Sequence, residues 1–131
     1  MTEEMPRAKG PETTPIRVLL AEDDGEMRDL VTRVLRDEGY EVLEARDGTE
    51  AIARLEEGDF DLVLSDVRMP GADGMEVLRR AMARNLHQPV ILMTAFGTIE
   101  FAVQAMREGA YHYIAKPFDI DDLVEIAANA A

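Results

Sequence analysis

Five short apolar runs alternate with longer segments of helical period, and this alternation constrains the fold more than any other feature of the chain. Most of the runs are continuously apolar and lack the polar residue at every second position that a half-exposed strand carries. Such runs are typical of strands buried on both faces. They are Ile16–Ala21, Tyr40–Ala45, Leu62–Ser65, Val90–Thr94 and Tyr111–Ala115.

The segments between the runs have the pattern of amphipathic helices. In the first, apolar residues recur at three- and four-residue spacing over Met27–Leu35, and Gly39 is suited to end the helix. Asp47 and Glu50 resemble a capping box at the start of the second helix, which Gly58 ends.

Three further helical segments complete the alternation. Met75–Met82 marks the third, and the fifth begins near Asp119, where following aspartates suit the positive end of the helix dipole. The fourth stops at Gly109 and carries an apolar stripe made of Ile99, Ala102, Val103 and Met106. The alternation predicts an α/β protein of (βα)5 type, a doubly wound five-stranded parallel sheet with right-handed crossovers and helices on both faces.

The composition limits the possible classes of protein. A chain of 131 residues fits one domain, and the absence of cysteine excludes disulfides, thiolate metal sites and a cysteine nucleophile. The lack of cysteine also favours a reducing, cytoplasmic location. A net charge of −13 argues against direct binding to nucleic acid or to an anionic membrane, because phosphate groups attract basic surfaces.

The N-terminal stretch Met1–Pro15 is polar, contains three prolines and lacks the apolar segment of a signal peptide. No apolar run in the chain approaches the roughly 18 residues needed to span a bilayer. We therefore expect residues 1–15 to form a disordered tail and residues 16–131 to form the folded domain.

Carboxylate, hydroxyl and amine side chains, which can bind a metal or take part in catalysis, lie at the ends of four of the five predicted strands. Because ligands bind beyond the carboxyl ends of strands in a parallel sheet, we expect these side chains to meet at one edge. They are Glu22, Asp23 and Asp24 after the first run, Asp66 after the third, Thr94 at the end of the fourth and Lys116 after the fifth.

This set of side chains fits a phosphoryl acceptor. Crowded carboxylates repel one another unless a cation joins them, and Mg²⁺ prefers such oxygen ligands. An aspartate can act as nucleophile toward phosphorus, while a lysine and a hydroxyl stabilise the phosphoryl oxygens. Taken singly, Asp24 is suited to cap a helix, Asp66 to form a turn before Pro70 and Lys116 to be solvated. Taken together, the placements at the correct ends of four strands favour the functional interpretation.

Four stretches resemble the receiver domains of bacterial two-component response regulators, and the resemblance covers Ile16 to about Ala128. The stretches are VLLAEDD at 18–24, LVLSDVRMPGADG at 62–74, VILMTAFG at 90–97 and GAYHYIAKPF at 109–118. The resemblance implies a flavodoxin-like receiver fold with strand order 2-1-3-4-5. It also implies a cis peptide bond between Lys116 and Pro117.

The resemblance assigns roles to individual residues. It makes Asp66 the phosphoacceptor, assisted by Thr94 and Lys116. Thr94 would also act as the switch hydroxyl, together with Tyr113 as the coupled aromatic residue. The Mg²⁺ ligands implied are Glu22, Asp23, Asp66 and the backbone carbonyl of Arg68; Glu22 stands where an aspartate is commoner.

The function implied by the resemblance is a signalling switch. A sensor histidine kinase would transfer a phosphoryl group from its phosphohistidine to Asp66, and the surface of the fourth helix, fifth strand and fifth helix would then change. The same surface could join two copies in a homodimer. The chain would act as an enzyme only on itself, in its own phosphorylation and slow dephosphorylation.

The stretches MTAFGTIE at 93–100 and MREGAY at 106–111 are similar to the nitrogen-regulator type. Receivers of that type precede an AAA+ module that activates sigma-54-dependent transcription. The fifth helix stops abruptly at Ala131, so an excised receiver and a stand-alone receiver that acts through protein–protein contacts both stay open.

Other interpretations fit the residues less well. A haloacid-dehalogenase-type phosphatase needs an acid two residues after its nucleophile, where this chain has Arg68. A flavodoxin-like electron carrier would not place three acids beside a flavin phosphate, and a degenerate receiver would normally lack Asp66 or Lys116. His87 and His112 lack metal-ligand spacing.

Arg68 and Phe96 each lie two residues beyond a site residue, where their bulk could hinder water from attacking the phosphoryl group. This hypothesis fails if replacing both with small residues leaves the hydrolysis rate unchanged.

Overall fold

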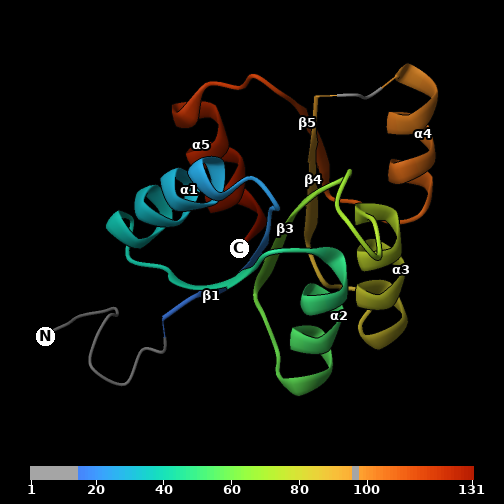
Figure 1. Ribbon diagram of the computed structural model, residues 1–131, viewed down its shortest axis with the longest axis horizontal. Coiled ribbons are helices and arrows are strands. Elements are labelled where there is room, and N and C mark those ends of the chain that lie inside the picture. Colours follow the sequence, from blue (N-terminus) through green and yellow to red (C-terminus); the bar gives the residue numbers. More distant parts are fainter. Residues whose placement is uncertain (1–14, 96–97) are drawn as a thin grey trace, which may run out of the picture.

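The computed structural model describes residues 15–95 and 98–131, and its fold is a five-stranded parallel sheet flanked by five helices (Figure 1). Strands and helices alternate along the chain, and the strand order is β2-β1-β3-β4-β5, as predicted. The elements are β1 Arg17–Ala21, α1 Gly25–Asp37, β2 Glu41–Ala45, α2 Gly48–Glu57, β3 Leu62–Asp66, α3 Gly74–Arg84, β4 Val90–Thr94, α4 Ile99–Arg107, β5 His112–Ala115 and α5 Ile120–Ala130. The expected disordered tail lies outside the described residues, apart from Pro15, and so does Phe96.

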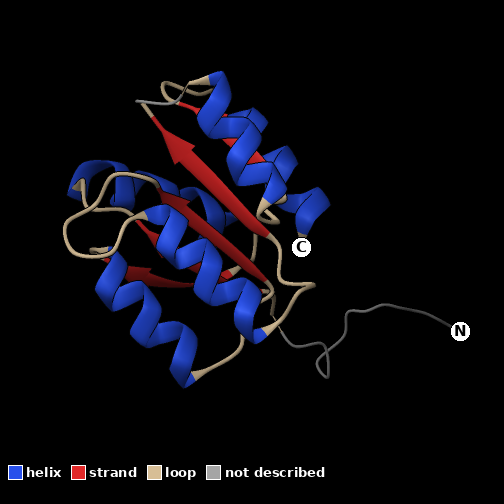
Figure 2. Cartoon of the chain, turned by 90° about the vertical axis from the view of Figure 1, so that its right-hand side faces the viewer, coloured by secondary structure: helices blue, strands red, loops and turns tan. Residues whose placement is uncertain are grey.

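Both faces of the sheet are covered by helices, which explains why the strands are continuously apolar in sequence. Helices α1 and α5 lie on one face, and α2, α3 and α4 lie on the other (Figure 1). Side chains of β1 alternate between the two cores, with Leu19 on the α2–α4 side and Leu20 on the α1–α5 side. All residues of β3 and β4 are buried. Figure 2 shows the strands running in the same direction, which brings their carboxyl ends to one edge.

The helix ends largely follow the predicted signals. Gly39 and Gly109 follow α1 and α4 with φ of 95° and 108°, backbone conformations that a glycine adopts without strain. Asp47 caps α2 by accepting a hydrogen bond from Glu50 N at 2.8 Å. The predicted capping box is wrong in one respect, because the Glu50 side chain accepts from Arg46 N at 2.7 Å, one residue before the cap.

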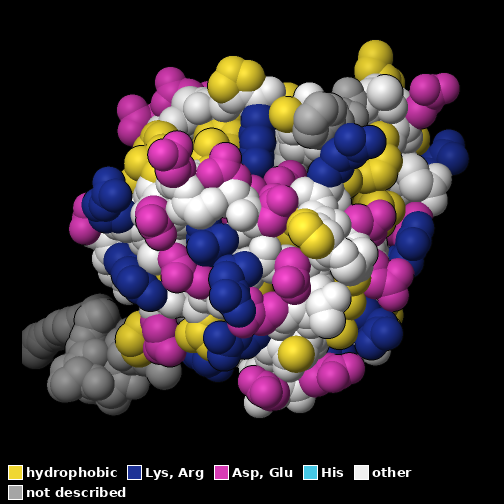
Figure 3. Space-filling view, viewed as in Figure 1, with side chains coloured by type: hydrophobic (Ala, Val, Ile, Leu, Met, Phe, Trp, Pro, Cys, Tyr) yellow, Lys and Arg dark blue, Asp and Glu magenta, His cyan; other side chains and the backbone are white. Residues whose placement is uncertain are grey.

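Helix α4 is present as predicted, but it does not bury the apolar stripe identified in its sequence. Its apolar stripe should face the core, but Ile99 is 84% exposed, Val103 44% and Met106 48%. Figure 3 shows hydrophobic side chains at the surface over this helix. Instead, α4 packs through the fully buried Ala105 and the half-buried Phe101, which lie four residues apart on another face. In a helix with apolar residues on both faces, periodicity alone does not decide which face is buried.

None of the described helices is both long enough and apolar enough to cross a membrane.

Candidate functional site

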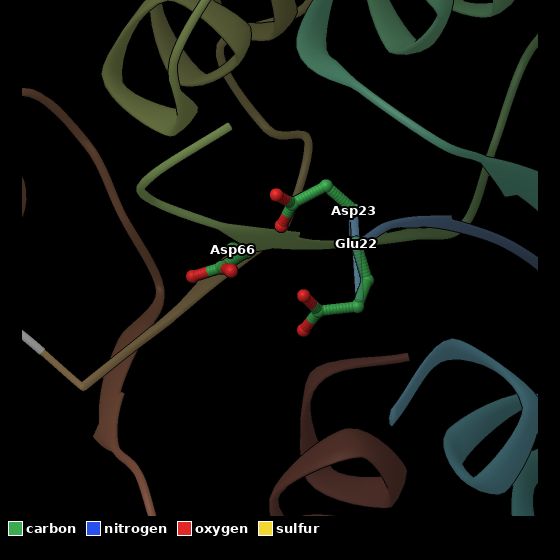
Figure 4. A group of neighbouring side chains, drawn as sticks. All are labelled: Glu22, Asp23 and Asp66. Carbon is green, nitrogen blue, oxygen red and sulfur yellow. The ribbon is translucent and has the colours of Figure 1, made fainter. Parts of the chain in front are cut away.

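Three carboxylates converge at the carboxyl edge of the sheet. Glu22 and Asp23 directly follow β1, and Asp66 ends β3. Because Ala21 pairs with Ser65 in the parallel register, the next residues of the two strands are neighbours. One carboxylate oxygen from each of Glu22, Asp23 and Asp66 lies within 4.8 Å of the others, and Figure 4 shows the side chains pointing into the same space. The predicted juxtaposition is therefore present.

Asp66 is a buried carboxylate held on both sides. Its side chain accepts a hydrogen bond from Val67 N at 2.8 Å through Oδ1, and Lys116 Nζ lies 3.3 Å from Oδ2. The residue is only 7% exposed. The Ser65 hydroxyl donates to the Asp66 carbonyl at 2.8 Å, which fixes the backbone as well. Asp66 is thus held with Oδ2 directed toward the lysine.

Glu22 and Lys116 form a buried ion pair. Lys116 Nζ lies 2.7 Å from Glu22 Oε1, and the Glu22 side chain is 1% exposed. Burial raises the pKa of Glu22 from 4.5 to about 7; the charge of Asp66 adds to this rise, and the hydrogen bond from Lys116 opposes it. Burial also lowers the pKa of Lys116, but its bonds to Glu22 and its attraction to Asp66 outweigh that effect and raise this pKa above its usual value. Lys116 therefore stays charged at neutral pH, while Glu22 lies near the midpoint of its titration.

The two remaining acids of the loop after β1 have different surroundings. Asp23 is exposed and belongs to the three-carboxylate group. Asp24 stands outside that group and caps α1, because its Oδ1 accepts from Glu26 N at 3.0 Å and from Met27 N at 3.3 Å. The capping interpretation of Asp24 is confirmed.

Thr94 and Lys116 are brought to the site by neighbouring strands. Thr94 ends β4 and is 1% exposed, and its carbonyl accepts a hydrogen bond from Lys116 N at 2.8 Å. The peptide bond between Lys116 and Pro117 is cis, as the resemblance to receiver domains implied. A groove of about 610 Å³ runs past Thr94, between the loop after β3 and the start of α4. Arg68 and Phe101 are among the residues that line it.

Tyr113 lies on β5 beneath α4. The Phe101 and Tyr113 rings meet edge to face with centroids 5.8 Å apart. The Tyr113 hydroxyl is buried, and no residue in the described ranges gives it a hydrogen bond. The roles predicted for Tyr113, and for the exposed Arg68 through its backbone carbonyl, stay predictions.

Three further residues shape the site and were not predicted to contribute to it. Arg28 donates from Nη1 to the Glu22 carbonyl at 2.8 Å, Ser65 binds the Asp66 backbone, and Phe101 contacts Tyr113. A serine inside an apolar strand, directly before the candidate nucleophile, is a signal that could have identified Ser65. The contribution of Arg28 could not be recognised in the sequence, because its side chain binds a backbone carbonyl, which every residue has.

The donor set fits a hard divalent cation. The three clustered groups are carboxylates, whose oxygens are the ligands that Mg²⁺ prefers, usually together with water and phosphate oxygens. His87 and His112 are exposed and lie on the α3–β4 loop and on β5.

Residues 18–128 match the family model of the response regulator receiver domain. The chain belongs to this family. The receiver domain is 42% identical over 113 residues to the C4-dicarboxylate transport transcriptional regulatory protein DctD of Rhizobium meliloti, covering 86% of this chain and 25% of that protein. It is 38% identical over 113 residues to the DNA-binding transcriptional regulator NtrC of Salmonella typhimurium, covering 86% of this chain and 24% of that protein. The chain thus spans about a quarter of the length of these relatives.

Solved structures support the same fold for this receiver domain. A CheY-like response regulator receiver domain protein from Methanospirillum hungatei superposes with a TM-score of 0.85 at 32% identity, covering 88% of this chain and 93% of that one. The receiver domain of NtrX from Brucella abortus gives a TM-score of 0.79 at 36% identity, covering 86% and 96%.

Proposed function

We propose that Asp66 accepts a phosphoryl group from the phosphohistidine of a sensor histidine kinase, with Mg²⁺ bound beside it. One observation carries this proposal: Asp66 Oδ2 faces Lys116 Nζ at 3.3 Å, while Glu22 and Asp23 bring their carboxylates within 4.8 Å of the same side chain. A nucleophile, a mobile cation and two metal-binding groups therefore share one edge of the sheet.

In the proposed reaction an Asp66 carboxylate oxygen attacks phosphorus, a P–O bond forms, and the P–N bond to the kinase histidine breaks. The electron pair of that bond leaves with the imidazole nitrogen, which then takes a proton from solvent. Lys116 stabilises a phosphoryl oxygen with its ammonium charge, and the Thr94 hydroxyl donates a hydrogen bond to another.

Glu22, Asp23 and Asp66 would hold the metal, with the Arg68 backbone carbonyl as a further ligand. When bound, Mg²⁺ neutralises charge that develops on the transferring phosphoryl group. Glu22 and Asp23 place two further carboxylates beside Asp66, and Lys116 is the one positive side chain whose contact with it is described, so the cation would also reduce the repulsion that an incoming phosphate would meet.

The output of phosphorylation would be a change in the surface formed by α4, β5 and α5. Movement of Thr94 toward the phosphoryl group would open space for Tyr113, and the Phe101–Tyr113 contact would transmit this to α4. Such a change is a population shift that the new charge-assisted hydrogen bonds favour. The exposed apolar residues of α4 support a role for the α4–β5–α5 surface as a homodimer or partner contact.

We further infer a cytoplasmic receiver that spans residues 16–131 and controls sigma-54-dependent transcription through an AAA+ module. The names of DctD and NtrC, both transcriptional regulators, support a transcriptional output, and the sigma-54 and AAA+ assignment rests on the resemblance of residues 93–100 and 106–111 to the nitrogen-regulator type. With a net charge of −13, the chain itself would not bind nucleic acid directly.

The direct test is incubation with acetyl phosphate, a small phosphodonor, followed by measurement of the intact mass. We expect a gain of one phosphoryl group with Mg²⁺ and none with EDTA. A gain that is equal in EDTA would contradict the proposed metal dependence, and no gain in either would contradict the phosphoacceptor function.

A further inference from the structure

Arg28 ties helix α1 back to the loop that carries two of the three clustered carboxylates. Its Nη1 donates a hydrogen bond to the Glu22 carbonyl at 2.8 Å, and its backbone N–H donates to the Asp24 carbonyl at 2.9 Å. The half-buried guanidinium lies over the first turn of α1, because Nη2 is 3.6 Å from the place where a Cβ on Gly25 would stand. The backbone bond is the first i→i−4 bond of α1, which any residue at this position would make, so it is the side chain of Arg28 that ties the helix to the Glu22 carbonyl.

In the loop after β1, the backbone at Glu22 and Asp23 determines where the two carboxylates point. Glu22 and Asp23 leave the backbone in opposite directions, as consecutive residues of an extended chain do, and their carboxylate ends turn toward the same region, with one oxygen of each within 4.8 Å of the other (Figure 4). The peptide between the two residues is planar, so its orientation decides the direction in which the Asp23 side chain leaves the backbone. The carbonyl of that peptide is the group that Arg28 binds.

Other bonds hold Glu22 but not Asp23. Glu22 N–H donates to the Ala45 carbonyl at 3.1 Å, and the Glu22 carboxylate binds Lys116 and the backbone N–H of Asp24. The Asp23 carboxylate is exposed and has no hydrogen bond or ion pair within residues 15–95 and 98–131. Its direction therefore depends on the backbone before it, which Arg28 fixes.

We propose that Arg28 is a positioning residue that fixes the Glu22–Asp23 peptide so that the Asp23 carboxylate faces the divalent cation. This inference rests on the proposed function, since it requires Glu22, Asp23 and Asp66 to bind that cation.

If Arg28 acts by positioning the loop, its removal weakens metal binding; if it acts only through its charge, its removal strengthens metal binding. A guanidinium beside the site repels a cation, so its charge alone weakens metal binding, and removing that charge would strengthen it. If Arg28 acts by orienting the loop, its removal weakens binding in spite of the lost repulsion. The sign of the change separates the two effects.

The test is titration of the metal-free protein with Mn²⁺ in place of Mg²⁺, with free Mn²⁺ measured by electron paramagnetic resonance. Arg28→Met keeps an apolar stem for packing and removes the donor. Arg33→Met removes the same charge from the exposed surface of α1 and serves as the matched control. Arg28→Lys restores a donor on a long stem.

We expect Arg28→Met to weaken Mn²⁺ binding about tenfold or more, as the loss of groups that orient metal ligands commonly does. Arg33→Met should bind as tightly as the wild type or slightly tighter, and Arg28→Lys should recover most of the loss. Binding by Arg28→Met that equals or exceeds that of Arg33→Met would overturn the proposal while leaving the proposed function intact. A wild-type chain that binds no Mn²⁺ would overturn both.

Discussion

Lys116 Nζ lies 2.7 Å from Glu22 Oε1, which joins the loop after the last strand to the loop after the first across the candidate site. The same ammonium reaches Asp66 at 3.3 Å. Lys116 therefore lies between two carboxylates, and the proposed divalent metal would have to share Glu22 with it. Under the proposed function, Lys116 would weaken metal binding and favour phosphoryl transfer.

Lys116→Gln should separate these two effects. Removing a positive charge beside Glu22 strengthens Mg²⁺ binding, because repulsion between the two cations is lost. The same change should slow phosphorylation by acetyl phosphate by about 10²-fold, since a charged donor to the developing phosphoryl charge is lost. Mn²⁺ titration and the time course of the intact mass measure the two quantities. Weaker metal binding together with unchanged phosphorylation would refute the role given to Lys116.

The stability of the metal-free protein should fall as pH rises from about 5 to 8. The pKa of Glu22 is about 7 in the folded chain and 4.5 when unperturbed, so between these values the folded state keeps a proton that the unfolded state has released. Folding is thus favoured at the acidic side of this window, and up to about 3 kcal/mol is lost as pH rises through 7.

Thermal unfolding in EDTA across this pH range measures the effect. Glu22→Gln should flatten the dependence, and Mg²⁺ should restore stability at pH 8 by binding the deprotonated site. A melting temperature that rises with pH in the wild type and the variant alike would contradict this account of Glu22.

The sequence predicted those parts of the fold and site that depend on order along the chain. Strands β3 and β4 are buried on both faces, so their continuous apolar runs identified them, and β4 was placed without error. The placement of Asp66, Thr94 and Lys116 at one edge was predicted because strand ends in a parallel sheet share that edge, and the roles of these residues stay predictions.

Features that depend on packing were not predictable. Ile99 and Phe101 are both apolar residues of α4, and only tertiary contacts decide that Phe101 packs against the core while Ile99 is exposed. The acidic run at 22–24 does not reveal that Glu22 is buried while Asp23 is exposed, although burial sets the pKa of Glu22.

Gly74→Ala should destabilise the protein through the backbone of Asp66. A Cβ at this position would overlap the Asp66 carbonyl oxygen and lie 2.8 Å from Val67 Cα, so the loop after β3 would have to move. We expect a loss of about 1–3 kcal/mol in urea unfolding. Gly58→Ala is the control, because its Cβ would meet Arg17 Nη1 at an ordinary 3.5 Å. Equal stabilities of the two variants would show that the loop is not tightly packed against Gly74.

The C-terminal end of α4 should be tied to α3 by the Arg79–Glu108 pair. Arg79 Nε and Nη2 lie 2.7 and 3.2 Å from the two Glu108 oxygens, and Gln104 adds a bond at 2.6 Å. The hydrogen bond from Arg79, followed by that from Gln104, lowers the pKa of Glu108 to about 2. The stabilisation is therefore complete above pH 4.5 and is lost as pH falls toward 2.

A double-mutant cycle of Arg79→Gln and Glu108→Gln, followed by thermal unfolding at neutral pH, should show a small favourable coupling that shrinks with added salt. The exposed pair of Arg80 and Glu56 is joined by one contact of 3.4 Å, and it should show no measurable coupling under the same conditions. Equal coupling in both pairs would contradict the special role of the two-bond geometry.

The measurement that tests the central claim most directly is the intact mass of Asp66→Asn after incubation with acetyl phosphate and Mg²⁺, beside the wild type and Asp59→Asn. Asp59 is a fully exposed aspartate, so the control changes the same side chain away from the site. The account predicts one added phosphoryl group in the wild type and in Asp59→Asn, and none in Asp66→Asn. A phosphoryl group that still appears on Asp66→Asn would contradict it.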